Sequence, residues 1–248
     1  MNTIIETIQN HRSIRHYEDR PLTDEQIKMI VESAQAAATS SFVQAYTIIG
    51  VKDPEKKKEL ALLSGNTHVE KNGHLLVFCA DLHRHELVAE MEEVNVQQSL
   101  DTTENFMIAL IDTALAAQNA AVAAESLGLG ICYIGGLRNN LDGVSKVLNI
   151  PKYVLPLFAM TIGYPSKIND KKPRLPFEHI YHEDGYQTDS SILKKQLGDY
   201  NKIIHDYYME RTNGKRSDTW TKQMALKFKE PSRTYMKEYV QKQGFNKK

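Results

Sequence analysis

The longest apolar stretch of the chain lies between Phe106 and Leu127 and reads FMIALIDTALAAQNAAVAAESL. Alanine and other good helix formers dominate it and few charges interrupt it, so we expect one long helix. A helix that is apolar almost all round must be covered, either at the centre of a domain or at a subunit interface. The small side chains that would let another helix approach closely are Ala114, Ala117, Ala121 and Ala124.

Length, composition and charge limit what can surround this helix. A chain of 248 residues with 41% hydrophobic residues can form one sizeable domain or two small ones. Its 31 basic residues balance 31 acidic ones, which argues against binding to nucleic acid or to an anionic membrane surface. No basic leader and no uninterrupted apolar run of about 18 residues is present, so we expect a soluble, cytoplasmic protein.

The order of the other elements favours a mixed fold. We expect helices over residues 2–10 and 54–65, and a third that starts at Thr23, whose capping box is completed by Gln26. Residues rich in β-branched and apolar side chains predict strands over 47–53, 74–82, 128–136 and 154–165, the second of them central in its sheet. The alternation is not a strict βαβ rhythm, so an α+β sheet fits at least as well as a doubly wound one. Beyond Pro176 we expect helices and loops that wrap over the core without an interior of their own.

The cysteines and histidines do not form a recognisable catalytic or metal-binding motif. Cys79 and Cys132 each lie inside an apolar run, which is typical of buried thiols that act as small hydrophobes. His83 and His85 are the one close histidine pair, and we interpret them as polar residues that follow a strand. No metal site is expected.

A basic cluster follows the first helix. The segment HRSIRHYEDRP at 11–21 places up to five cations within ten residues and adds the hydroxyl of Ser13. Guanidinium groups recognise phosphate oxygens in bidentate fashion, so the cluster suits a phosphate group. A solvated charged turn explains the same composition equally well.

Three further segments could also bind an anion. Gly135 and Gly136 end a strand and open onto a helix, where backbone N–H groups can approach a ligand, although a plain tight turn gives the same pattern. The segments INDKKPRLP at 168–176 and YYMERTNGKRSDTW at 207–220 are basic loops around Pro173 and Asn213-Gly214, and each could equally be solvated surface. No GxSxG, HExxH, Walker or EF-hand motif is present, so hydrolase and kinase functions have no support.

Taken together, five segments resemble the nitroreductase-like flavoprotein family, and within it the NADPH-dependent FMN reductase and oxygen-insensitive nitroreductase group, which is NfrA-like. These segments are HRSIRHYEDRPL, SSFVQAY at 40–46, CYIGGLRN at 132–139, KPRLP at 172–176 and ERTNGKR at 210–216. The resemblance spans essentially the whole chain. It implies a single domain over residues 1–248 with a central, mostly antiparallel sheet flanked by helices, an extension at about 177–248, and an obligate homodimer.

The resemblance also implies a role for individual residues. FMN, bound without a covalent link, would be held by His11, Arg12, Ser13, Arg15, Ser40, Ser41, Tyr133, Ile134, Gly135, Gly136, Lys172 and Arg174. NADPH and the substrate would be met by Phe42, Arg211, Lys215, Arg216 and Arg233. The serines would come from the other subunit or from a facing loop. Related proteins carry a GNQ stretch that touches the flavin, whereas this chain has Gly65-Asn66-Thr67-His68, so the residue that makes this contact stays open.

The implied activity is an NADPH oxidoreductase that reduces free flavin, nitroaromatics, quinones or related small acceptors in a ping-pong cycle. The hydride passes through flavin N5, so no catalytic side chain is needed, and Lys172 is a candidate stabiliser of the reduced flavin. The alternative is an FMN-binding or storage protein with little turnover. The basic segment 210–216 argues against storage, because storage does not require a nicotinamide nucleotide.

Overall fold

The computed structural model describes residues 2–248, and the chain divides into two compact units. The first unit ends at Asn169 and resumes with Arg233–Lys248, and the second is Asp170–Ser232. The helices of the first unit are α1 (Thr3–Gln9), α2 (Asp24–Gln35), α3 (Pro54–Ser64), α4 (His83–Met91), α5 (Gln97–Leu100), α6 (Thr103–Ser126), α7 (Leu141–Leu148) and α10 (Met236–Lys242). Those of the second unit are α8 (Ser190–Arg211) and α9 (Trp220–Lys229).

A four-stranded sheet forms the centre of the first unit. Its strands are β1 (Tyr46–Val51), β2 (His74–Asp81), β3 (Gly130–Ile134) and β4 (Val154–Gly163). They lie in the order β1-β2-β4-β3 and every pair is antiparallel. The expected α+β sheet is therefore confirmed. All eight residues of β2 are buried and β2 lies inside the sheet, as its continuous apolar sequence predicts.

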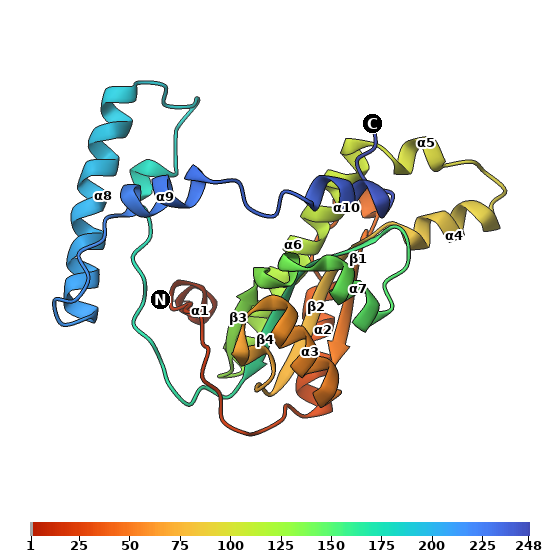
Figure 1. The fold of residues 1–248 in the computed structure, drawn as a ribbon, viewed down its shortest axis with the longest axis horizontal. Coiled ribbons are helices and arrows are strands. Elements are labelled where there is room, and N and C mark those ends of the chain that lie inside the picture. Colours follow the sequence, from red (N-terminus) through yellow and green to blue (C-terminus); the bar gives the residue numbers. More distant parts are fainter. Residues whose placement is uncertain (1) are drawn as a thin grey trace. The chain divides into compact units, whose positions relative to one another are not determined.

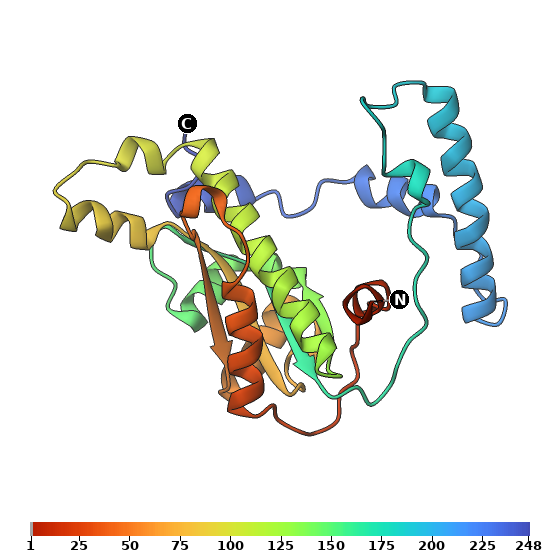
Figure 2. The same ribbon diagram turned by 180° about the vertical axis from the view of Figure 1, so that it is seen from behind.

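Helices cover both faces of this sheet. Leu76 and Phe78 of β2 pack toward α2 and α6, whereas Leu75 and Val77 pack toward α3 and α7. Figure 2 shows α2 and α6 over one face, and Figure 1 shows α3 and α7 over the other. The alternation of side chains along a strand thus divides the core into two apolar layers.

The long apolar helix is confirmed as α6, and it is half covered within the chain. Ala117, Ala121 and Ala124 are buried where α2 packs against it. Ala114 is exposed and makes no close helix contact within the chain, so its predicted role at a subunit interface stays a prediction. The opposite face carries exposed apolar side chains, including Ile111. By length and composition alone, α6 is also the one helix of residues 2–248 that could cross a membrane, a test that the core helix of a soluble protein passes too.

Local signals set the helix ends. At the start of α2, the Thr23 hydroxyl accepts from Gln26 N at 3.2 Å and the Gln26 side chain accepts from Thr23 N at 3.1 Å, which confirms the capping box. At the end of α3, Gly65 adopts the left-handed conformation with φ of 67°. Cys79 and Cys132 are both free and buried, as expected.

The second unit is smaller and has a short apolar centre. Tyr200, Ile204 and Tyr208 lie on one side of α8 and are buried, with Trp220 of α9 against them. Residues 233–248 return to the first unit, where Tyr239, Val240 and Phe245 join its core. The expectation that the region beyond Pro176 has no interior of its own is therefore wrong. That this region wraps over the core stays a prediction.

Candidate functional site

The basic segment after α1 is fixed to the edge of the sheet. Ile14 N donates to Ile131 O of β3 at 2.8 Å, and the Ile14 side chain is 4% exposed. A Cβ at Gly130 would lie 2.5 Å from Ile14 Cγ1, so only glycine allows this approach. One apolar residue in the middle of the basic segment therefore attaches it to β3.

The next residues continue this attachment just beyond the end of β4. Ser166 N donates to His16 O at 3.0 Å, and Tyr17 pairs with Pro165 in an isolated bridge. The Tyr17 hydroxyl donates to Ile14 O at 2.6 Å, and its burial raises the pKa of this phenol. The backbone of the segment is thus paired with the edge of the sheet, while charged side chains such as Arg15 stay exposed.

The four predicted phosphate residues have different surroundings. His11 Nδ1 lies 2.7 Å from Glu125 Oε1, a carboxylate that sequence reasoning did not single out. Arg12 Nε donates to Asn10 O at 3.0 Å, and Arg12 and Glu125 line a cavity of about 440 Å³ near the end of α6. Ser13 contacts the Cys132 thiol, whose pKa is raised by burial in spite of the opposing effects of Arg15 and Ser13. Arg15 is exposed.

Arg15 acts on a histidine that was missed in the sequence. His68 belongs to the short 3₁₀ helix η2 (Thr67–Val69), and its Nε2 is buried without a hydrogen-bond partner. Burial, and then the charges of Arg15 and His16, lower the pKa of His68. The lowered pKa favours the neutral imidazole, and a bound anion would offset the positive charge of Arg15 that contributes to this shift. The unusual run Gly65 to His68 was the available signal.

The stretch Gly65 to His68 also approaches the glycine pair, through Asn66 at its N-terminal end. Gly135 and Gly136 open the 3₁₀ helix η3 (Gly135–Asn139), and a Cβ at Gly136 would lie 2.4 Å from both Ser64 O and Asn66 Nδ2. Glycine is needed here for the approach of another loop of the protein. Just before the pair, Ile134 is buried, and Tyr133 donates its hydroxyl to Ala117 O at 2.9 Å.

Arg233 joins this region through η3. Its Nε and Nη2 donate to Asn139 Oδ1 at 3.0 and 2.8 Å, and Asn139 Nδ2 donates to Ser64 O at 3.1 Å. Asn66 Nδ2 also donates to Ser64 O, at 2.7 Å. Burial, with a contribution from Arg233, lowers the pKa of Arg138. The structure therefore links Arg233, the end of α3 and η3 in one hydrogen-bonded network.

The predicted serine loop is exposed at its tip. Ser40 and Ser41 are exposed in the 3₁₀ helix η1 (Ser40–Phe42), and the Phe42 side chain is 82% exposed. Such an apolar side chain in solvent is available for contact with a ligand or another chain.

The remaining predicted cations lie in the second unit. Arg174 Nη1 donates to Lys172 O at 2.8 Å, and both residues line a cavity of about 400 Å³. Arg211 Nη1 donates to the Tyr207 hydroxyl at 2.6 Å. Arg216 Nε lies 2.7 Å from Asp218 Oδ2. The family resemblance assigns Lys172 and Arg174 to FMN, and Arg211 and Arg216 to NADPH.

Tyr208, which sequence reasoning missed, lies between the two groups. Arg216 Cζ is 4.0 Å from the centre of its ring and Lys172 Nζ is 5.7 Å from it. Burial raises the pKa of Tyr208, but the hydrogen bond from Lys172 and the charges of Lys172 and Arg216 outweigh it, so the net shift is downward. Lys172 and Arg216 thus both make cation–π contacts with the Tyr208 ring within the second unit.

Comparisons with known proteins show the family and agree with the fold. The model of the nitroreductase family matches residues 8–164, and that of the nitroreductase family, C-terminal domain, matches residues 172–248. The chain is 56% identical over 248 residues to FMN reductase (NADPH) of Bacillus subtilis strain 168, covering 100% of both chains.

Two solved structures have the same fold as this chain. The structure of B. megaterium NfrA1 has a TM-score of 0.98 at 63% identity and covers 99% of this chain and 100% of its own. NADPH:FMN oxidoreductase from Vibrio harveyi, complexed with NAD+, has a TM-score of 0.90 at 37% identity, with 100% of both chains covered. The chain therefore belongs to the nitroreductase family.

Proposed function

We propose that this chain is an FMN-containing, NADPH-dependent oxidoreductase that reduces free flavin, nitroaromatics, quinones or related small acceptors. The names of the Bacillus subtilis and Vibrio harveyi relatives support both the flavin and the nicotinamide nucleotide. The observation that carries the proposal is the stretch Asn66 to His68. It meets Gly136 at one end and lies in the field of Arg15 at the other, so it joins two of the predicted flavin segments.

The residues of this region fit FMN. Its phosphate needs hydrogen-bond donors and positive charge, and Arg15 offers both beside the unpartnered His68 Nε2. Its flat ring needs backbone at close range, which the segment Tyr133 to Gly136 offers because the side chains of Tyr133 and Ile134 are anchored in the core. We therefore assign His11, Arg12, Ser13 and Arg15 to the phosphate and ribityl end.

The protein residues are assigned to binding and orientation. When bound, FMN supplies the acceptor and donor of hydride. Lys172 is our candidate for stabilising negative charge on the reduced ring, with Arg174 beside it. Arg211, Lys215 and Arg216 are assigned to the 2′-phosphate of NADPH, and Arg233 and Phe42 to the substrate pocket.

We further propose that the working molecule is a cytoplasmic homodimer and that residues 1–248 form one functional domain. Support comes from α6, where Met107, Ile111 and Leu115 are 49%, 51% and 44% exposed and recur every four residues. Such a stripe is typical of a helix that is covered by another chain. Ile111→Glu should yield monomers in light scattering, whereas Leu62→Glu at an exposed site on α3 should not. A monomeric parent protein would contradict the dimer.

Steady-state kinetics test the proposed activity against flavin storage. We expect NADPH oxidation with free FMN as acceptor to give parallel double-reciprocal lines, because both substrates use the same flavin in turn. Purified protein that contains FMN but turns over NADPH no faster than free FMN does would show a storage protein instead.

A further inference from the structure

The loop from Ser40 to Ala45 has an unusual backbone. Ser41, Phe42 and Gln44 have φ angles of 47°, 61° and 55°, although none of them is glycine. Residues with side chains rarely adopt this left-handed region, and three of them within four positions persist only where the surroundings impose the conformation. Something outside the loop must therefore hold it.

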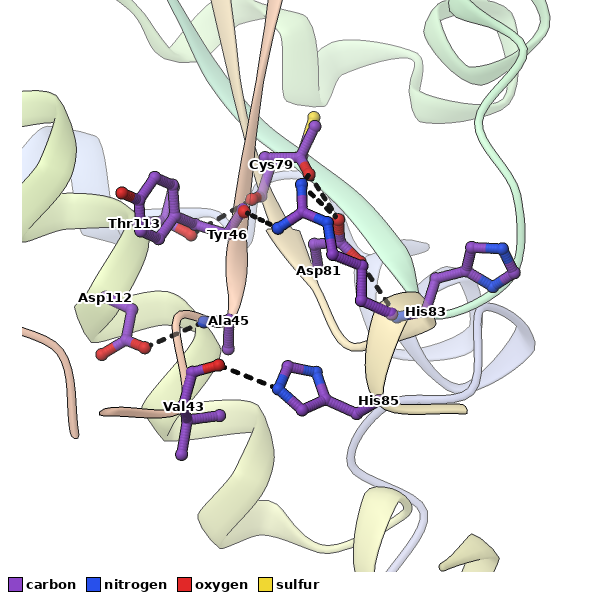
Figure 3. A network of polar contacts seen from close by, with 11 residues as sticks. Val43, Ala45, Tyr46, Cys79, Asp81, His83, His85, Asp112 and Thr113 are labelled. Atoms are coloured by element: carbon purple, nitrogen blue, oxygen red, sulfur yellow. Dashed lines mark hydrogen bonds and ion pairs between the residues drawn. The ribbon is translucent and has the colours of Figure 1, made fainter. Parts of the chain in front are cut away.

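One buried carboxylate holds both ends of this loop. Asp112 in the middle of α6 has no exposed surface, and its Oδ1 accepts from Ser40 N at 2.9 Å while its Oδ2 accepts from Ala45 N at 3.0 Å. Figure 3 shows this carboxylate next to Ala45. A carboxylate is costly to bury unless its oxygens are hydrogen-bonded, and here both oxygens receive backbone N–H groups from the loop.

A histidine holds the middle of the loop from the other side. His85 Nε2 lies 2.9 Å from Val43 O, and its Nδ1 is buried without a partner. A carbonyl oxygen can only accept, so Nε2 carries the proton and donates it. Three backbone groups of the loop are thus fixed by side chains from α4 and α6, which leave the tip at Phe42 free.

We propose that Asp112 and His85 are positioning residues that hold the loop in this conformation, so that Ser40, Ser41 and Phe42 are presented in one geometry to flavin and acceptor. This role rests on the proposed function, because it assigns the loop tip to ligand contact. The tip does not serve the core, since Phe42 is almost fully exposed. A loop whose backbone conformation is held by its surroundings, and whose tip carries an exposed apolar side chain, is typical of a preorganised ligand-binding loop.

Backbone amide exchange of the purified full-length protein, with whatever flavin it retains, tests the hold itself. In Asp112→Asn one oxygen is replaced by an NH2 group, so one of the two loop amides loses its acceptor. We expect exchange at Ser40 or Ala45 to become at least about tenfold faster. In His85→Ala we expect faster exchange across 40–45 with α6 unchanged. The matched control is Thr113→Ser, because Thr113 is equally buried on α6 and its hydroxyl bonds to Cys79 O and Ala109 O instead.

Two functional measurements separate positioning from a general loss of stability. For both variants we expect about tenfold faster release of FMN or a similar rise in KM for free FMN as acceptor, with a smaller change in kcat. Thr113→Ser should lower the melting temperature without either effect. If Asp112→Asn does not fold, the same measurements on His85→Ala alone test whether these side chains position the loop.

Wild-type amide protection in both variants would overturn the proposal, as would loosening of the loop without any change in FMN release or KM. A parent protein without flavin would contradict the proposed function, while faster exchange at Ser40 or Ala45 would still support the hold by Asp112.

Discussion

The two basic segments, residues 11–16 and 211–216, are similar in composition and are held in different ways. In the first, Ile14 is buried against β3 and the backbone bonds to Ile131 and Ser166. In the second, the end of α8 supports the chain mainly through Thr212, which bonds to Tyr208 O and accepts from Arg216 N. The first is built into a sheet and the second lies on the surface of a helix end. This difference fits our proposal that the first segment binds a resident cofactor and the second a transient co-substrate.

The largest expected effect concerns stability. Ile14→Ala should lower the free energy of unfolding by about 3 kcal/mol, because it leaves a cavity against β3. Thr212→Ala should cost about 1 kcal/mol, since it removes hydrogen bonds at a partly exposed site. Denaturant titration measures both, with Ile168→Ala, at a residue 67% exposed, as the neutral control. Equal costs at positions 14 and 212 would remove the distinction between the two segments.

The next effect is on the retention of cofactor. Arg15→Ala should weaken FMN binding by about 100-fold, because a charge-assisted contact to the phosphate is lost, and the protein should purify colourless or lose its flavin on dilution. The ratio of flavin to protein absorbance measures this. Arg20→Ala is the matched control, since Arg20 follows the segment closely in sequence but lies over the Tyr164 ring, with its Cζ 3.9 Å from the ring centre. Full flavin content in Arg15→Ala would remove Arg15 from the phosphate site.

A smaller effect is expected in the second segment. Replacing both Arg211 and Arg216 with Ala should raise KM for NADPH by about tenfold and leave KM for NADH nearly unchanged, because only NADPH carries the extra phosphate. Lys222→Ala on the exposed side of α9 is the control. Equal changes for the two nucleotides would mean that these arginines do not read the 2′-phosphate.

The smallest effect is a pH dependence in the sheet that carries residues 11–16. Burial, with the charges of Lys57 and Lys52, lowers the pKa of His74 to about 4. The unfolded chain, with an ordinary histidine pKa near about 6.5, then binds more protons than the folded chain between these values. Stability is therefore fully present above pH ~6.5 and falls as the pH decreases toward about 4.

Between pH ~7.5 and ~5.5 the expected loss is about 1 kcal/mol. His74→Gln should flatten this part of the stability profile, whatever it does to stability at neutral pH. An unchanged slope in that variant would assign the acid sensitivity to other groups.

The features that the sequence predicted correctly are those set by residues close together in the chain. The capping box at Thr23, the end of α3 at Gly65 and the central, buried β2 follow from local pattern and were confirmed. The exposure of Ala114 depends on which side of α6 faces α2, and composition does not determine that side.

The residues that sequence reasoning missed act over long separations or through space. Asp112 lies 72 positions from Ser40, and no local pattern connects them. The pKa values of His68 and Tyr208 are shifted partly by cations that lie near them only in the folded chain. The assignment of Arg15 and Arg216 to two different ligands stays a prediction.

The absorption spectrum of the purified protein, followed by anaerobic addition of NADPH and then of NADH to a second sample, tests the proposed function most directly. We predict a bound-flavin spectrum that NADPH bleaches rapidly and NADH bleaches much more slowly, with colour restored by an added acceptor. A colourless protein that does not take up FMN, or a flavin that NADPH fails to reduce, would contradict the account.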